Sequence, residues 1–217
     1  MKKSDVLFRT VIAVCMISCC VSTLSARHHT HMSRSGRISE NWYMYFGAGY
    51  SFLHYPDEAQ DALDEINDQP GVGHFSFSVD ALGFYWPIAG NSTILGTVIN
   101  FTGDNYSTDG GSNTFSVNQG MLDISVMHSL TDATGEGITL RADVGPAWLS
   151  TEYTRTVATT TTTTRSNLLV GFGFLVGAGY ALPVSSETSL MFNAKYALRM
   201  IDDERFGAAT IEVGVLF

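Results

Sequence analysis

Cysteine is scarce in this 217-residue sequence, and the three that occur, Cys15, Cys19 and Cys20, all lie within its first 20 positions. They belong to a segment with a basic start, an uncharged run over residues 10–21 and small residues ending at Ala26, which is the layout of a secretory signal. The uncharged run is shorter than the roughly 20 residues that a membrane-spanning helix needs. We therefore expect a signal peptide over residues 1–26, and a mature chain that cannot rely on disulfide bonds.

Two alternatives concern this end of the chain. Ile17, Ser18 and Cys19 partly match the pattern before an acylated cysteine, so lipoprotein processing competes with ordinary cleavage. The next segment, residues 27–40, begins RHHTHMSRSGR, and its clustered histidines could bind a transition metal. Because no Cys, Asp or Glu stands beside these histidines, a flexible polar periplasmic leader is the favoured interpretation.

Basic residues are also few. The chain has 12 Lys and Arg against 21 Asp and Glu. Removal of residues 1–26 takes away three basic residues and one acidic residue, which leaves 9 against 20 and a formal net charge of −11. Phosphate binding needs a basic surface, so this balance argues against nucleic acid as a partner. The remaining length, residues 41–217, suits a single domain.

The dominant period of this domain is two, not the 3.6 residues of a helix. In TLRADVGPAWLS (residues 139–150) and SLMFNAKYALRM (residues 189–200), apolar and polar residues alternate. Successive side chains of a strand point to opposite faces, so each segment has one apolar and one polar face. Eight such segments lie at about residues 41–55, 72–86, 92–102, 114–130, 138–154, 168–182, 188–200 and 206–217.

The connections between these segments alternate in length. PDEAQDALDEINDQPG, GDNYSTDGGSN, RTVATTTTTTRSN and the shorter IDDER alternate with the tight turns PIAGN, TDATGEG and PVSSE. An even number of strands with long loops at one end and short turns at the other is the plan of a transmembrane β-barrel. The sequence therefore predicts an all-β, eight-stranded antiparallel up-and-down barrel.

Strand length favours the membrane over a soluble lipocalin-like barrel. Most segments exceed the 9–11 residues that a tilted strand needs to cross the hydrocarbon. Aromatic residues also stand near the ends of the segments, as in the interfacial girdles of membrane barrels. The residues concerned are Trp42, Tyr43, Tyr55, Tyr85, Trp86, Trp148, Tyr153, Tyr180 and Phe217.

The last nine residues, ATIEVGVLF, carry a resemblance to a known family. Ile211, Val213 and Val215 alternate back from the terminal Phe217, a pattern that resembles the assembly signal of bacterial outer-membrane barrels. The whole domain resembles the small eight-stranded barrels of the OmpA/OmpX type. This resemblance implies a monomer in the outer membrane of a Gram-negative cell, surrounded by lipid and lipopolysaccharide. It also implies that the barrel-assembly machinery recognises Phe217.

A barrel of eight strands is just wide enough for side chains to fill it. The polar faces supply charges of both signs, and unpaired charges inside would cost several kcal/mol each. We therefore predict a network of paired charges that closes the interior, with an ion-conducting channel as the alternative. The residues assigned to this network are Asp80, Asp123, Arg141, Asp143, Lys195, Arg199 and Glu212.

No catalytic residue, cofactor or metal ligand is predicted. Some eight-stranded barrels modify lipid A, and His74 with Ser76 shares a strand face while Glu152 supplies a conceivable acid. Because that face is expected to point inward, hydrogen-bonded filling is favoured over a nucleophile. The predicted function is a structural surface barrel, whose exposed loops contact host, lipopolysaccharide or other cells.

Three further stretches need an interpretation. The acidic first loop has the spacing of a short surface helix, because Ala59, Leu63 and Ile66 recur at helical intervals. The run of threonines at 159–164 predicts a hairpin extension, a disordered tip or an adhesive surface. LLVGFGFLVGAGYALPV, at residues 168–184, lacks the spacing of a dinucleotide-binding loop. As a strand it would turn its glycines inward, where they leave room for long charged side chains.

Overall fold

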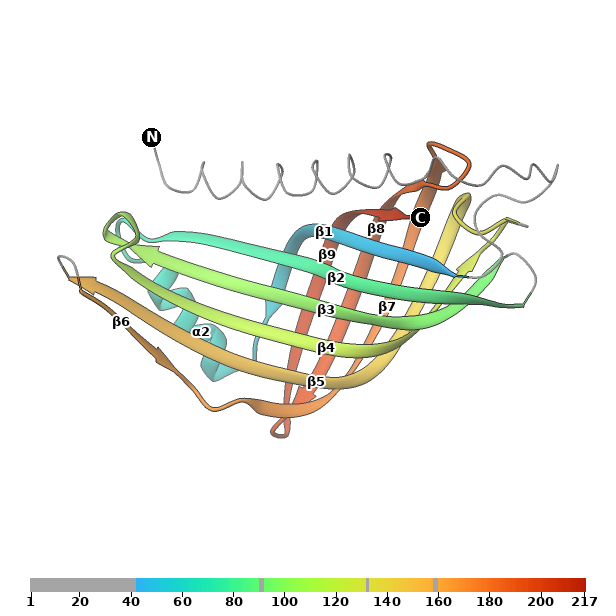
Figure 1. Ribbon diagram of the computed structural model, residues 1–217. Helices are drawn as coiled ribbons and strands as arrows, with labels where there is room; N and C mark the ends of the chain where they lie inside the picture. The colour runs from blue at the N-terminus through green and yellow to red at the C-terminus, as the bar shows by residue number, and fades with distance from the viewer. Residues whose placement is uncertain (1–41, 90–91, 132, 158–159) are drawn as a thin grey trace.

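The computed structural model describes residues 42–89, 92–131, 133–157 and 160–217, so the predicted signal and leader lie outside the described residues. Strands make up most of this part of the chain (Figure 1). They are β1 (Tyr43–His54), β2 (Gly73–Ala89), β3 (Thr93–Thr108), β4 (Asn113–Ser129), β5 (Gly137–Val157), β6 (Thr160–Arg165), β7 (Leu169–Pro183), β8 (Ser189–Ile201) and β9 (Glu204–Leu216). One α-helix, α2 (Asp57–Asn67), and a short 3₁₀ helix, η1 (Asp109–Gly111), complete the described elements.

The strands close into a barrel. From β1 to β5 and from β7 to β9, consecutive strands pair antiparallel, β1 pairs with β9, and β5 pairs with both β4 and β7. The remaining strand, β6, pairs only with β5 and extends it beyond the barrel wall. The structure therefore confirms the predicted fold, a closed eight-stranded antiparallel up-and-down barrel.

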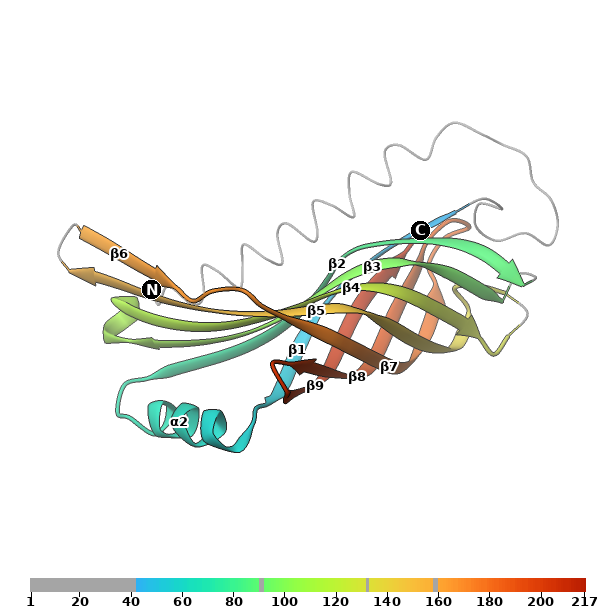
Figure 2. The ribbon, with the colours of Figure 1, turned by 90° about the horizontal axis from the view of Figure 1, so that it is seen from below.

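Four strands are the longest of the barrel. β2, β3, β4 and β5 have 17, 16, 17 and 21 residues, whereas β1, β7, β8 and β9 have 12 to 15. Their projecting ends form a curved sheet at the end of the barrel that also carries α2 and β6 (Figures 1 and 2). We call this the outer end, and the opposite end, with the β2–β3, β4–β5 and β7–β8 turns, the inner end.

The connections at the outer end can each be compared with the sequence predictions. The acidic segment forms α2, as its helical spacing predicts. The threonines from Thr160 onward extend the β5 hairpin, and all of β6 is exposed. The last connection differs from the predicted long loop. Asp202 and Asp203 alone turn the chain between β8 and β9, both with positive φ (53° and 65°), as a two-residue type I′ turn requires.

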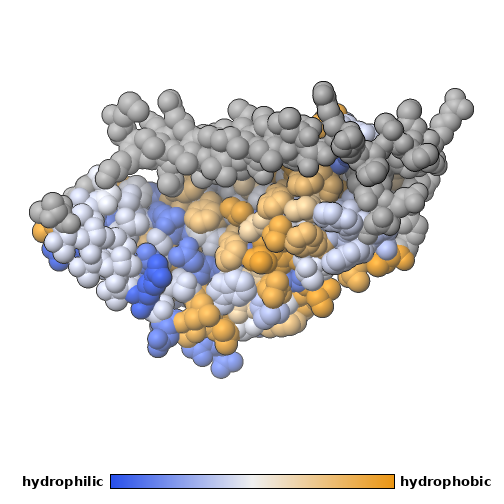
Figure 3. Space-filling view, viewed as in Figure 1, coloured by the Kyte–Doolittle hydropathy of each residue, from blue (hydrophilic) through white to orange (hydrophobic). Residues whose placement is uncertain are grey.

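The barrel is apolar outside and polar within. Outward side chains such as Val170 (70% exposed) and Ile211 (65% exposed) leave large apolar areas uncovered. In Figure 3 such side chains gather over the barrel body, while the projecting sheet is mostly hydrophilic. No helix among the described residues has the length and apolar character needed to cross a membrane.

One part of the aromatic prediction is wrong. Trp42, Trp86, Tyr153 and Tyr180 are exposed on the outer surface, as girdle residues should be. Tyr43, Tyr55 and Tyr85, in contrast, are at most 4% exposed and point into the barrel. At Tyr85 the cause is a β-bulge between Asp80 and Leu82, which shifts the register and exchanges the two faces of β2 beyond it.

Candidate functional site: the charged interior of the barrel

All seven charged residues assigned to the interior are buried, with exposures from 0% for Asp80 and Arg199 to 7% for Arg141. They come from five strands on different sides of the barrel: β2 (Asp80), β4 (Asp123), β5 (Arg141, Asp143), β8 (Lys195, Arg199) and β9 (Glu212). Each lies on the polar face of a strand whose other face is apolar. The period of two therefore brings them into one interior.

Five of the seven form a continuous chain of ion pairs. The Arg141 guanidinium contacts Asp80 and lies 2.6 Å from Asp143 Oδ2 through Nη2. The Lys195 ammonium lies 2.9 Å from Asp80 Oδ2 and 2.5 Å from Glu212 Oε2. Asp80 is the centre of this chain, because both basic side chains reach the same carboxylate oxygen.

Neutral side chains complete the hydrogen bonding of these carboxylates. Asn100 donates to Asp80 Oδ1 at 2.7 Å, and Ser125 donates to Asp143 Oδ1 at 2.5 Å. The Tyr45 hydroxyl donates to Glu212 Oε1. These neutral partners were not among the predicted site residues.

The other two charged residues stand apart from the ion-pair chain. Arg199 donates from Nη1 to Gln119 Oε1 (3.1 Å) and from Nη2 to Asn100 Oδ1 (2.6 Å), so its partners are amides. Asp123 is 1% exposed, and within the described chain neither of its carboxylate oxygens has a hydrogen-bond partner. The structure thus joins five of the predicted residues directly and places Arg199 and Asp123 beside them.

Apolar layers lie above and below the charges. The inner layer contains Tyr43, Tyr45, Tyr85, Ile94, Met127, Ala181, Met191 and Leu216. The outer layer contains Tyr55, Leu63, Tyr106, Val117, Met121, Ala147, Leu149, Leu175, Ala197, Ile201, Phe206 and Ala208. Leu63 belongs to α2, so this helix packs on the outer layer and covers the interior from outside. The seven charged residues assigned to the interior therefore lie between two apolar clusters, and the outer cluster also contacts the Asp104 carboxylate through Tyr55 and Tyr106.

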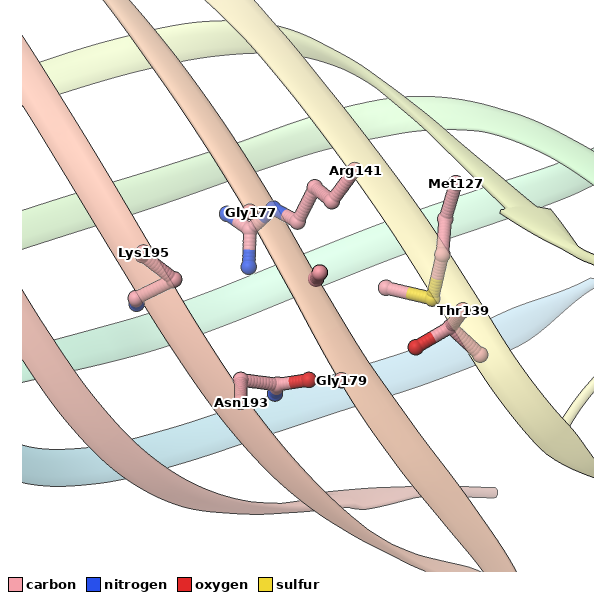
Figure 4. Close-up of a pocket in the computed structure, with 8 residues that line it drawn as sticks. Met127, Thr139, Arg141, Gly177, Gly179, Asn193 and Lys195 are labelled. Atoms are coloured by element: carbon pink, nitrogen blue, oxygen red, sulfur yellow. The ribbon is translucent and has the colours of Figure 1, made fainter.

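Glycines of β7 leave space beside the charges. Gly177 stands opposite both Arg141 on β5 and Lys195 on β8. The side chains of Arg141, Lys195 and Asn193 lie around the inner face of β7 (Figure 4), and they border a cavity of about 10 Å³, room for about one water molecule. The outward residues of this strand, such as Phe174 and Val176, are exposed, as the alternation predicts.

A second glycine has a different neighbour from the one expected. Gly173 lies opposite Arg199, but a β-carbon placed on it would lie 2.8 Å from both Sδ and Cε of Met121. At this level the space is filled by a methionine of the outer apolar layer. The space beside the glycines of β7 is therefore filled by charged side chains at Gly177 and by an apolar side chain at Gly173.

The His74 and Ser76 pair faces inward and meets a different acid from the one considered. His74 Nε2 lies 2.8 Å from Asp104 Oδ1 and 3.2 Å from Ser76 Oγ, and the serine also contacts Asp104. Glu152 instead pairs with Arg165, at 2.6 Å. In a catalytic triad the acid holds the opposite ring nitrogen. Here serine and acid share one nitrogen, and Ser76 is only 2% exposed.

Asp104 anchors the segment that leads into α2. The Tyr55 hydroxyl donates to Asp104 Oδ2 at 2.8 Å, and the Tyr106 hydroxyl approaches the same oxygen at 3.3 Å. Burial, together with the Asp104 carboxylate, raises the pKa of the Tyr55 phenol, so this group remains a donor. The Tyr55 ring also packs edge-on against Phe206 of β9. Tyr55 therefore ties the start of α2 to both sides of the barrel.

The residues of the predicted assembly signal lie on the outer surface. Ile211 and Val213 are 65% and 48% exposed, and Val215 and Phe217 are partly exposed. The Phe217 ring stacks with Phe46 of β1 at 6.2 Å, and backbone hydrogen bonds join Phe217 to Met44. The end of the chain thus seals the seam between the first and last strands.

A closed up-and-down barrel with apolar side chains outside and paired charges inside is the outer-membrane type of membrane protein. The fold predicted from the resemblance to the OmpA/OmpX type is confirmed by the closed eight-stranded barrel itself.

Comparisons with known proteins give structural likenesses only. No protein-family model and no curated protein matches the chain. The attachment invasion locus protein Ail of Yersinia pestis is similar in structure, with 11% identity, a TM-score of 0.48, and coverage of 82% of this chain and 100% of that chain. Neisserial surface protein A has 15% identity, a TM-score of 0.43, and coverage of 82% and 96%. The N-terminal barrel domain of Pseudomonas aeruginosa OprF has 10% identity, a TM-score of 0.36, and coverage of 82% and 98%.

Proposed function

We propose that the protein is a structural surface barrel of the outer membrane, with a closed interior and an outer sheet that makes contacts outside the cell. The observation that supports it best is the layered interior. A chain of ion pairs from Asp143 through Asp80 to Glu212 fills the middle, and apolar layers cover it at both ends. Ion conduction needs a continuous polar path, which this arrangement interrupts twice.

The closed interior is tested by reconstituting the purified protein in planar bilayers. We expect no stepwise conductance, while a large porin measured in the same bilayers shows that channels would be seen. Stable conductance steps from the pure protein would refute the closed interior. They would favour the narrow channel that the sequence also allows.

The surface role rests on the projecting sheet of β2–β5 and on β6, which place polar, exposed side chains beyond the apolar band (Figure 3). Contacts with host molecules, lipopolysaccharide or other cells would be made here. A deletion series, one outer connection at a time, assayed for adhesion and for survival in serum, identifies which connection matters. Adhesion and survival unchanged by every deletion would contradict the proposal.

Orientation can be tested because the proposed mature chain, from Arg27 onward, has no cysteine. Thr162 in β6 and Ser186 in the β7–β8 turn are both exposed and lie at opposite ends of the barrel. We expect Thr162→Cys to react with a membrane-impermeant maleimide in intact cells. The matched variant Ser186→Cys should react only after the outer membrane is permeabilised. The reverse pattern would overturn the proposed orientation, and labelling of the unmodified protein would contradict removal of the signal.

The same proposal excludes enzymatic activity and assigns the C-terminal residues Ile211, Val213, Val215 and Phe217 to recognition by the assembly machinery. The shared histidine nitrogen and the burial of Ser76 support the first point. The exposure of Ile211 and Val213 on one face supports the second. The protein would act as a monomer, because the barrel leaves no main strand edge unpaired within the membrane.

A further inference from the structure

A hollow on the outer surface of the barrel lies where β1, β9 and β8 meet the outer end. It has a volume of about 580 Å³. Its floor is Gly207, which pairs with His54 on one side and Leu198 on the other. Because glycine has no side chain, the outer surface of the sheet is left uncovered between the side chains of His54 and Leu198. A β-carbon on Gly207 would lie 2.9 Å from the Tyr196 hydroxyl oxygen and 3.5 Å from His54 Cβ.

The hollow has two kinds of wall. Towards the membrane it is lined by Tyr196, which is 48% exposed, and by Leu198. Towards the outside it is lined by Asp57, the first residue of α2, and by Asp203, Glu204 and Arg205 around the β8–β9 turn. The turn and the start of α2 lie at the same end of the barrel (Figures 1 and 2). The hollow is therefore apolar below and polar above.

Its height matches the boundary of the membrane. Val215 lies eight positions after Gly207 in β9, and it pairs with Leu190 next to the inner β7–β8 turn. At about 3.3 Å per residue and a tilt of about 40°, Gly207 stands roughly 20 Å above Val215. The apolar band of such barrels is about 25 Å tall, so the hollow lies near its outer edge. Just below it, Phe52 and Ala209 continue the lipid-facing surface.

The charges of the hollow limit the kind of headgroup that fits. Arg205 and His54 face three carboxylates, those of Asp57, Asp203 and Glu204. A bare phosphate would meet an excess of negative charge. Sugar hydroxyls both donate and accept hydrogen bonds, so they can use both kinds of side chain. An exposed tyrosine ring also offers a flat apolar face to a sugar ring, as aromatic residues do at membrane interfaces.

Among the described residues, His54, Asp57, Asp203, Glu204 and Arg205 form no ion pair or side-chain hydrogen bond with one another or with the rest of the barrel. Their donors and acceptors are available to a ligand.

We propose that the hollow over Gly207 binds the saccharide headgroup of an outer-leaflet glycolipid, whose acyl chains lie against the apolar surface below Tyr196. This inference rests on the proposed location in the outer membrane and gives the barrel a specific lipid contact there. The lower wall continues the lipid-facing surface, and the upper wall supplies hydrogen bonds at headgroup height.

The test is native mass spectrometry of the folded protein after incubation with an uncharged glycolipid, a diacylglycerol that carries two galactose units. We expect one retained molecule on the unmodified protein. Arg205→Ala and Tyr196→Leu should each weaken retention about tenfold, the equivalent of about 1.4 kcal/mol, because each removes a hydrogen bond or the sugar-stacking face. The matched controls are Arg155→Ala, on the projecting part of β5, and Tyr180→Leu, an equally exposed tyrosine near the inner end.

Two further probes identify what is recognised. Phosphatidylglycerol, which has acyl chains and a phosphate but no sugar, should be retained at least tenfold less than the glycolipid. Equal retention of the two lipids, or equal loss in the control variants, would overturn the proposal. Cysteine labelling in intact cells tests the outer-membrane location independently. Normal labelling with no glycolipid retention would reject this site alone, while failed labelling would reject the location itself.

Discussion

Replacement of Lys195 by methionine tests whether the interior charges hold the barrel together as a network. The ammonium is the only basic group that reaches Glu212 among the described ion pairs, and it also contacts Asp80. Its side chain is 2% exposed and both carboxylates are fully buried, so water cannot replace it. Removal of one partner from a buried ion pair costs about 3–5 kcal/mol, because it leaves an uncompensated charge. We therefore expect Lys195→Met to lower the free energy of unfolding by about 3–5 kcal/mol.

The double variant Lys195→Met with Glu212→Gln separates this effect from simple loss of contacts. It removes the stranded carboxylate as well, and buried pairs replaced by neutral groups are often close to neutral in stability. Glutamine can still accept from Tyr45, while Asp80 keeps Arg141 and Asn100. We expect the double variant to recover at least half of the loss. This would appear as a positive coupling energy between the two sites.

Urea titration of the protein in lipid vesicles, followed by tryptophan fluorescence, measures both variants, and heat-modifiable gel mobility shows which fraction is folded. Arg165→Met is the matched control, since its pair with Glu152 is 74% exposed at the arginine and should contribute no more than about 1 kcal/mol. A single variant as stable as the control would refute the network. So would a double variant that is no more stable than the single one.

Four other changes test further features of the barrel. Asp123→Asn should leave the unfolding free energy unchanged or raise it in the same urea titration, because the buried carboxylate has no hydrogen-bond partner within the described chain. Gly173→Leu should impair folding, since the new side chain meets Met121, and normal heat-modifiable mobility of this variant would contradict that account. Ser76→Ala should leave lipid A unchanged by mass spectrometry, and an altered lipid A would revive the enzymatic alternative. Deletion of Phe217 should slow assembly, measured as folded protein per minute after a pulse of synthesis, whereas an unchanged rate would exclude its role as a signal.

The strand plan could be predicted from the sequence because both faces of each strand carry a strong signal. In β8, Phe192 and Tyr196 point to lipid while Lys195 and Arg199 point inward, as the alternation requires. Membrane barrels invert the usual polarity without changing the period, so the fold follows from period, strand number and turn spacing together. The inward placement of the charged residues follows from the same pattern.

Two features could not be predicted from the sequence, because they depend on local backbone geometry. The bulge after Asp80 turns Tyr85 inward, where its hydroxyl lies 2.9 Å from Ser125 Oγ, although strict alternation would expose it. The connection IDDER is short because Asp202 and Asp203 both adopt positive φ, which aspartate tolerates better than most residues. No glycine occupies the bulge or the two turn positions, so the sequence gives no local sign of either feature.

The alternation of polar and apolar residues predicts which side chains point inward. The position of each side chain along the barrel axis depends on the stagger between strands, which the sequence does not reveal. Asp80 meets Lys195 across the barrel although 115 residues separate them, while Asp123, on the same inward face of β4 as Ser125, meets no hydrogen-bond partner in the described chain. Five buried acidic residues, of which Asp104 is the fifth, share this interior with three basic residues, so carboxylates are in excess whatever the pairing. The excess implies that some carboxylates lack a basic partner, and the register leaves Asp123 without a hydrogen-bond partner among the described residues. A closed interior therefore depends on where the charges stand along the barrel axis as well as on how many there are.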